Sequence, residues 1–395
     1  MMKTYFLIPF LALLSALTPL AIDMYLPAMP SIASDFNVSI EIIQTTLSTY
    51  LLGFAIGQLF YGPLADSYGR KPVLICGLMI YLIASVGIVY GDSIEQFKWL
   101  RLLQAIGGGA ASVVVSSLLR DLFSGSLFSK MMSYVVLSMT LAPLVAPLIG
   151  AQLLVWFSWP SIFVALAIVT LICLLISYVG IKETLPKERR VAFNLRSIFA
   201  NYWLILKNRK ALGLMLCGGF NVSGMFAFLT ASPFVYIEYF GVDAQNYGYL
   251  FACNILGMMV VTWTNAKIVM RFGYQQILRA GIIISAVISV LFWLLNANLT
   301  FGLTGLVIST VAYVSLISLI GSNVMTGVLA EFPHISGTAS ALAATIRFGF
   351  GALSGVVISL LHDGTPLPMI MVISGCGILS FLSYFILTDR ANKDS

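Results

Sequence analysis

Twelve apolar stretches follow one another along this chain, each close to the roughly 20 residues that a helix needs to cross a bilayer. Only 9% of the residues are charged, whereas soluble proteins carry about 25%. The sequence therefore predicts an all-α membrane protein. The predicted helices cover residues 5–28, 42–61, 73–90, 97–119, 131–154, 157–180, 211–235, 246–266, 276–296, 300–323, 336–361 and 367–387.

A polar, basic segment divides these helices into two sets of six. We expect an N-terminal six-helix bundle over residues 1–181, a cytoplasmic linker over 182–210 and a C-terminal six-helix bundle over 211–395. The linker mixes aromatic with basic residues, which is typical either of an amphipathic helix on the inner leaflet or of a plain linker. Two pseudo-symmetric halves predict a substrate site near the bilayer midplane and transport by rocking of one half against the other.

The basic residues predict the orientation of the chain. With both termini in the cytoplasm, 18 of the 21 Lys and Arg residues fall on the cytoplasmic side and only Lys98 falls outside. The other two, Arg101 and Arg347, lie within predicted helices. The N-terminal apolar stretch resembles a signal peptide, but a second apolar stretch follows closely, so we expect the first helix to be retained.

Several other classes of protein are excluded or disfavoured. The basic residues form no continuous stripe for nucleic acid, and the five cysteines are scattered within apolar runs without disulfide or zinc spacing. No phosphate-binding loop is present for a primary pump, and the two histidines, His334 and His362, lie in loops at opposite faces. We therefore expect neither an enzyme nor a cofactor. The two-half organisation favours alternating access over a channel.

Asp23 is the most informative residue, because a carboxylate in an apolar helix costs about 2.5–3.5 kcal/mol. Arg101 is predicted at a similar depth. Burial opposes the charged carboxylate and a nearby guanidinium favours it, so the two residues could together carry and release a proton. A static structural pair, or an interfacial acid wetted from outside, remains an alternative. For Arg347, Glu238 and a substrate anion or dipole are both possible partners.

Further side chains are candidates for lining a substrate cavity, although most polar residues in membrane helices simply bond a neighbouring helix. These candidates are Tyr50, Gln58, Gln104, Asn221, Phe226, Asn254 and Arg347.

The segment from Gly62 to Lys71 resembles the signature loop of the major facilitator superfamily, between the second and third helices. Its glycines favour a tight turn, and its charged residues predict an ion-pair latch that gates the inner side. The gating residues are Gly62, Asp66, Gly69, Arg70 and Lys71. The resemblance implies that Asp66 faces the N-terminus of the eleventh helix, for which Ser336 is the expected cap.

Two further segments resemble motifs of the same family. Arg101 to Gln104 resembles its Arg-x-x-Gln-Gly motif, with Ala105 in place of the first glycine. A stretch of the fifth helix resembles the antiporter motif, which a Pro-kinked packing face would also explain. Its matching residues are Pro143, Pro147 and Gly150.

Residues 22–30 together with the signature loop resemble the bicyclomycin-resistance and chloramphenicol-resistance branch of the drug:proton antiporters. This resemblance implies a twelve-helix transporter of the bacterial inner membrane, which uses the proton gradient to export small amphipathic drugs. We expect the protein to function as a monomer. Export of small metabolites such as amino acids, and symport by the same fold, remain alternatives.

Overall fold

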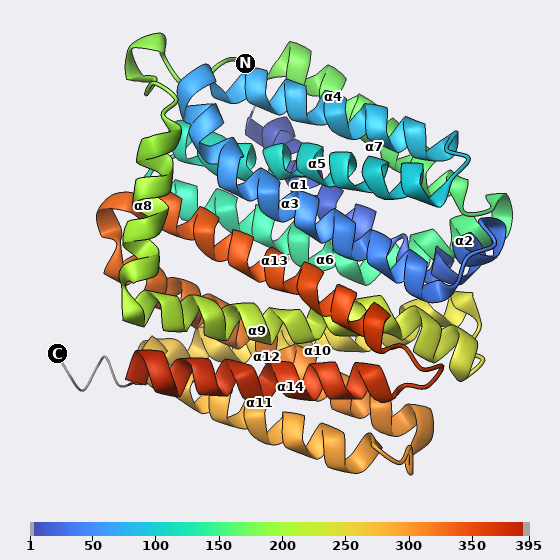
Figure 1. Ribbon diagram of the computed structural model, residues 1–395. Helices are drawn as coiled ribbons and strands as arrows, with labels where there is room; N and C mark the ends of the chain where they lie inside the picture. Colours follow the sequence, from blue (N-terminus) through green and yellow to red (C-terminus); the bar gives the residue numbers. More distant parts are fainter. Residues whose placement is uncertain (1–3, 390–395) are drawn as a thin grey trace. The chain divides into compact units, whose positions relative to one another are not determined.

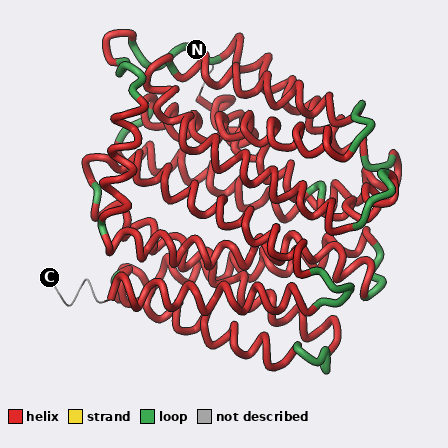
Figure 2. Tube along the Cα trace, viewed as in Figure 1, coloured by secondary structure: helices red, strands yellow, loops and turns green. Residues whose placement is uncertain are grey.

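The computed structural model describes residues 4–389, which form helices and connecting loops with no strand among them (Figures 1 and 2). Twelve helices in this described part are long and apolar enough to cross a membrane. The prediction of an all-α membrane protein with twelve spans is confirmed.

The chain forms two compact units. The first comprises Met1–Val38 and Thr49–Leu195, and the second comprises Ser39–Ser48 and Arg196–Ser395. Helix α3 therefore contributes to both. The elements up to the boundary at Leu195 are α1 (Thr4–Asp23), η1 (Leu26–Ala28), α2 (Met29–Asp35), α3 (Ile40–Tyr68), α4 (Arg70–Val89), α5 (Ile94–Leu122), α6 (Gly125–Phe157), α7 (Pro160–Gly180) and η2 (Lys187–Arg189). The elements from Leu195 onward are α8 (Leu195–Lys207), α9 (Arg209–Ser232), η3 (Pro233–Tyr239), α10 (Ala244–Phe272), α11 (Tyr274–Asn296), α12 (Gly302–Glu331), η4 (Pro333–Ile335), α13 (Ser336–Leu361), α14 (Leu367–Ser383) and η5 (Tyr384–Asp389).

In the first unit, α4 packs against α5 and α7, while α1 packs against α6 and α5. Arg101 is fully buried in the interior of this unit. In the second unit, α9 packs against α12, α13 and α14, and α12 also contacts α10 and α11. The first residues of α3 join this unit through Glu41, whose backbone carbonyl accepts a hydrogen bond from Ser359 at 2.8 Å.

Three predicted elements differ from the structure. The first predicted helix is broken after Asp23 and continues as η1 and α2. Helix α9 runs directly into a π-helical turn at Pro233, because proline has no N–H for the regular helical hydrogen bond. Ser336 is the first residue of α13 and not its cap; Ile335 holds the cap position, and no side chain caps this helix end.

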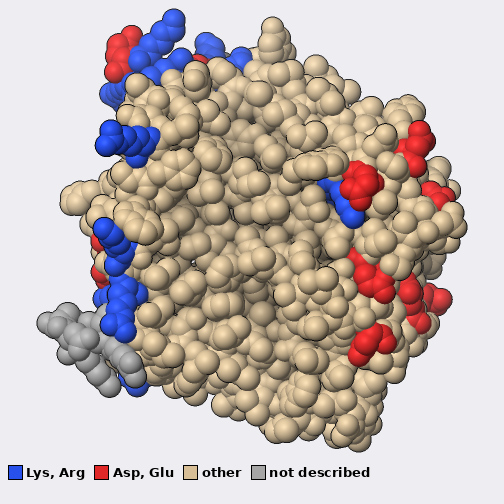
Figure 3. Space-filling model, viewed as in Figure 1, with Lys and Arg blue, Asp and Glu red and all other residues tan. Residues whose placement is uncertain are grey.

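The segment between α7 and α9 contains a 13-residue helix, α8, whose buried residues Tyr202 and Ile205 lie on one side. Phe199, Trp203 and Leu204 are exposed. In Figure 3, Lys and Arg side chains gather in the region of α8 and of the segment before it.

Candidate functional site

The polar centre of the first unit is built around Arg101 of α5, which is fully buried. Its Nη1 donates hydrogen bonds to the carbonyl oxygen of Ala21 at 3.2 Å and to Oε1 of Gln104 at 2.8 Å. Its guanidinium carbon lies 4.6 Å from the ring centre of Tyr25 and 4.4 Å from that of Tyr50. These distances allow cation–π attraction, which is strongest where water is excluded.

Two of the nitrogens of Arg101, Nε and Nη2, are buried without a hydrogen-bond partner. A buried donor that lacks a partner costs about 1–3 kcal/mol or more when the group is charged. Such a cost is tolerated at functional sites, where another state of the protein or a ligand supplies the missing acceptor.

Gln104 fixes the orientation of this guanidinium. Its Oε1 accepts from Arg101, and its Nε2 donates to Oγ of Ser85 in α4 at 2.8 Å. Ser85 in turn donates to the backbone carbonyl of Tyr81 at 2.8 Å. The oxygen and the nitrogen of the Gln104 amide therefore both form hydrogen bonds within the first unit, and Gln104 holds Arg101 in place. We call Arg101, Gln104, Ser85, Tyr25 and Tyr50 the Arg101 cluster.

Asp23 is the last residue of α1, at the point where the first span is interrupted. Its side chain is buried, with 4% of its surface exposed. Arg101 reaches the carbonyl of Ala21, two residues before Asp23. Asp23 and Arg101, both of which the structure describes, do not form an ion pair; the guanidinium bonds to Ala21 and Gln104 instead.

The antiporter-like motif lies directly beside this break. Helix α6 continues through Pro143 and Pro147, and its Gly150 contacts the backbone of Met24. A Cβ atom built on Gly150 would lie only 2.8 Å from both Cα and the carbonyl carbon of Met24. Only glycine fits there without moving one of the two helices, so the motif sets the position of the chain next to Asp23.

The signature loop forms an ion-pair network at the other end of the first unit. Arg70 pairs with Asp66, and its Nε lies 3.3 Å from Oδ2 of Asp121 in α5. The tight turn occurs at Gly69, which has a φ of 106°. The expected turn at Gly62 is wrong, because α3 continues through Gly62 to Tyr68.

Glu183 completes this network, and the sequence did not identify it or Asp121. The Glu183 carboxylate accepts from the backbone N–H of Arg70 at 3.0 Å and from that of Lys71 at 3.2 Å. It therefore caps the first turn of α4 from the segment that follows α7. Lys71 turns away and donates to the carbonyl of Tyr178 at 2.7 Å.

The remaining candidates occupy different environments. Asn221 donates to Oγ of Ser285 at 3.3 Å, and Asn254 donates to carbonyls of its own helix, so both bond within the second unit. Phe226 packs against Gly351 of α13, the helix that carries Arg347. Gln58 is buried in α3, about two turns from Tyr50.

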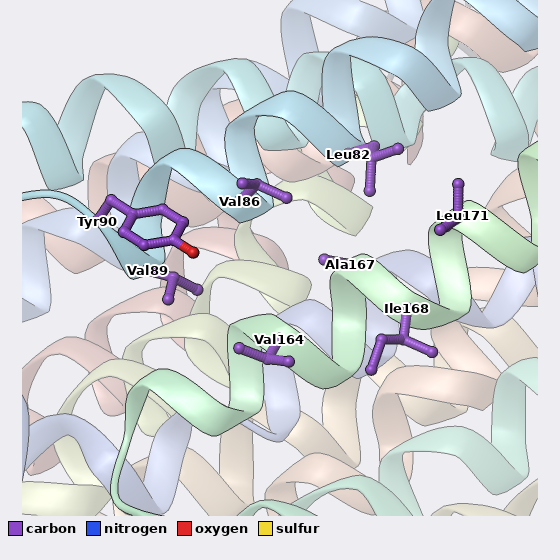
Figure 4. Close-up of a pocket in the computed structure, with 8 residues that line it drawn as sticks. All are labelled: Leu82, Val86, Val89, Tyr90, Val164, Ala167, Ile168 and Leu171. Atoms are coloured by element: carbon purple, nitrogen blue, oxygen red, sulfur yellow. The ribbon is translucent and has the colours of Figure 1, made fainter.

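A pocket of about 270 Å³ lies between α4 and α7 (Figure 4). The labelled side chains in Figure 4 come from both helices and from Tyr90 at the end of α4, and all are hydrocarbon except Tyr90. It contains none of the candidate residues. Its composition suits a lipid chain or another apolar group better than a polar substrate.

Comparisons with known proteins agree with this architecture. Residues 11–356 match the model of the Major Facilitator Superfamily. The chain is 36% identical over 391 residues to a bicyclomycin resistance protein homolog of Haemophilus influenzae, covering 99% of this chain and 98% of that protein. It is 30% identical over 372 residues to a chloramphenicol resistance protein of Pseudomonas aeruginosa, covering 90% and 84% of the two chains.

A crystal structure of the nucleoside transporter NupG has the same fold, with a TM-score of 0.75 at 13% identity over 96% of this chain and 99% of that one. The sequence match, the twelve spans and the shared fold lead to one conclusion. This chain belongs to the major facilitator superfamily of membrane transporters.

Proposed function

We propose that this protein exports small amphipathic drugs, such as bicyclomycin or chloramphenicol-like antibiotics, from the bacterial cytoplasm in exchange for protons. The names of the two resistance proteins support the substrate class. The observation that carries the proton coupling is the position of Asp23, a buried acid at the break of the first span.

Asp23 differs from the other acidic residues of the described spans. Each of the others lies within three residues of a span end, whereas Asp23 lies 12 residues before the end of its span at Asp35. Because a charged carboxylate is costly at this depth, Asp23 is a residue whose protonation would change the balance between conformations. Outward release of the drug is coupled to protonation of Asp23, and the inward return is coupled to its deprotonation.

Arg101 has a supporting role in this mechanism. Its two unpartnered nitrogens provide donors at the level of Asp23. In the conformation in which Asp23 is ionised, a small shift at the break in the first span brings the carboxylate to these donors. The ion pair then offsets the cost of the charge until the proton returns.

The test is proton movement in liposomes that contain the purified protein and a pH-sensitive dye. With a proton gradient imposed, bicyclomycin or chloramphenicol should release protons through the wild type, and Asp23→Asn should abolish this signal. Asp92→Asn is the matched control, because Asp92 lies in an exposed loop.

Each result has a definite meaning. If the folded Asp23→Asn variant still couples fully, Asp23 is structural and the mechanism is wrong. If neither drug moves protons through the wild type, the drug assignment fails, and export of small metabolites such as amino acids is tested next.

A further inference from the structure

Arg347 lies near the middle of the span Pro333–Leu361, 14 residues from each end. Its Nε is buried and has no hydrogen-bond partner. A guanidinium group carries five N–H donors and stays charged in proteins, so this position holds a permanent positive charge within the membrane-spanning part of the second unit.

The helical repeat shows which way this side chain is directed. Residues at i, i+4 and i+8 share one face of a helix, so Arg347 shares a face with Gly351 and Gly355. A Cβ on Gly351 would contact the ring of Phe226 in α9, and one on Gly355 would contact Thr230 of the same helix. The opposite side of α13 exposes Leu353 and Leu360. Arg347 therefore belongs to the packed face of α13 and not to the face that lipid would cover.

The residues that follow Arg347 in α13 include two phenylalanines that pack against rings of α9. Phe226 lies 5.6 Å from Phe348, measured between ring centres, and Phe220 lies 4.8 Å from Phe350. A charged residue in a helix stretch that otherwise packs through apolar rings suits a ligand that combines an apolar body with a polar acceptor group.

No acidic side chain that the structure describes in the second unit neutralises Arg347. Glu331 pairs with Lys210 at 2.8 Å, Glu41 lies 3.4 Å from His362, and Asp363 accepts from Thr365. Glu238, the partner suggested by the sequence, lies at the end of its span and forms no ion pair with Arg347. The charged residues that lie seven or more positions from both ends of a described span are Asp23, Arg101 and Arg347. Both arginines have buried nitrogens without a hydrogen-bond partner.

We infer that Arg347 is a specificity-determining residue that binds a hydrogen-bond acceptor of the substrate, such as a nitro, amide carbonyl or carboxylate group. The substrates are consequently neutral or anionic amphipathic molecules, and lipophilic cations are rejected. This inference rests on the proposed drug export. The charge of Arg347, which no described acid of the second unit neutralises, repels a cation, whereas an acceptor-rich molecule gains charge-assisted hydrogen bonds from the guanidinium.

The test is equilibrium binding of radiolabelled chloramphenicol to the purified full-length protein in detergent, where no proton gradient is required. Unlabelled tetraphenylphosphonium serves as the competing lipophilic cation. The wild type should bind chloramphenicol without competition from the cation. Arg347→Gln should weaken chloramphenicol binding by about tenfold or more, as expected for the loss of a charge-assisted hydrogen bond, and should admit the cation as a competitor.

Two further variants define the result. Arg347→Lys keeps the charge but loses the planar fork, so it should bind chloramphenicol with intermediate affinity and still reject the cation. Lys267→Gln removes an exposed cation of α10 and should change neither measurement. If Arg347→Gln fails to fold, the test rests on Arg347→Lys. An unchanged affinity of Arg347→Lys for chloramphenicol would then contradict the inference.

The outcomes separate this inference from the proposed function. Wild-type binding with an unchanged Arg347→Gln variant, or equal affinity of the wild type for the cation, overturns the role of Arg347 and leaves drug export intact. Absence of drug binding by the wild type overturns both. Drug binding without proton release in liposomes removes the coupling mechanism and leaves the role of Arg347 standing.

Discussion

Gly150 shows how a single residue can position a charged group that it does not touch. It contacts the backbone of Met24, the residue that follows Asp23. Replacing it with alanine places a methyl group against that backbone, so Gly150→Ala should lower the stability of the protein by about 1–3 kcal/mol, as overpacking usually does. Thermal unfolding in detergent measures this effect.

Gly375→Ala is the matched control, because Gly375 also lies within a helix but has open space where its Cβ would be. That change should leave the unfolding temperature unchanged or raise it, since alanine favours a helix over glycine. If the two variants unfold at the same temperature, the contact between Gly150 and the backbone of Met24 does not contribute to the packing of α6 against the end of α1.

At the residue scale, the sequence predicted those features of the site that depend on a single side chain or on two residues close together in the chain. The cost of a buried charge identified Asp23, Arg101 and Arg347, and the three-residue spacing of Arg101 and Gln104 is that of neighbours on a helix. The sequence did not reveal the hydrogen-bond and ion-pair partners that come from distant segments of the chain. Asp121 and Glu183 reach the signature loop only after α5 and α7 have packed beside it, and neither has a local signal that separates it from other loop acids.

At the element scale, the first turn of α4 depends on a residue more than 100 positions away. The first N–H groups of a helix lack partners within it. Here Glu183 accepts from the N–H groups of Arg70 and Lys71, and Pro72 has no N–H. Glu183→Ala should therefore open the first turn of α4. A cap is worth about 0.5–2 kcal/mol, so amide exchange at Lys71 should accelerate by roughly 2- to 30-fold, measured by hydrogen exchange.

Glu188→Ala serves as the control for this prediction, since Glu188 lies in the same segment, within the short helix η2. Equal exchange rates in the two variants would show that Glu183 does not cap α4.

The same segment continues into α8, where Phe199 and Trp203 are exposed next to basic residues. The sequence was compatible with either an amphipathic helix or a plain linker here. The contact of this helix with the inner leaflet stays a prediction.

At the scale of the whole molecule, the apolar pattern predicted the number of spans, because each crossing needs its own run of about 20 residues. The same pattern missed the break in the first span. Residues 24–28 are apolar and read as a continuous helix, although Pro27 and Pro30 are consistent with an interruption. The apolar composition of a segment indicates that lipid surrounds it, but it does not show whether the helix is continuous.

The distribution of charge predicts that both termini lie in the cytoplasm, and labelling tests this directly in both units. In a variant without its five cysteines, Asp92→Cys and Asn298→Cys should react with a membrane-impermeant maleimide in intact cells, because their loops have few basic residues. Lys187→Cys and Gln275→Cys, in the basic loops, should react only after the membrane is opened. The reverse pattern at all four positions would invert the protein and turn the proposed export into uptake. Reversal in one unit alone would mean that the chain crosses the membrane an odd number of times between Lys187 and Gln275, where two spans are described.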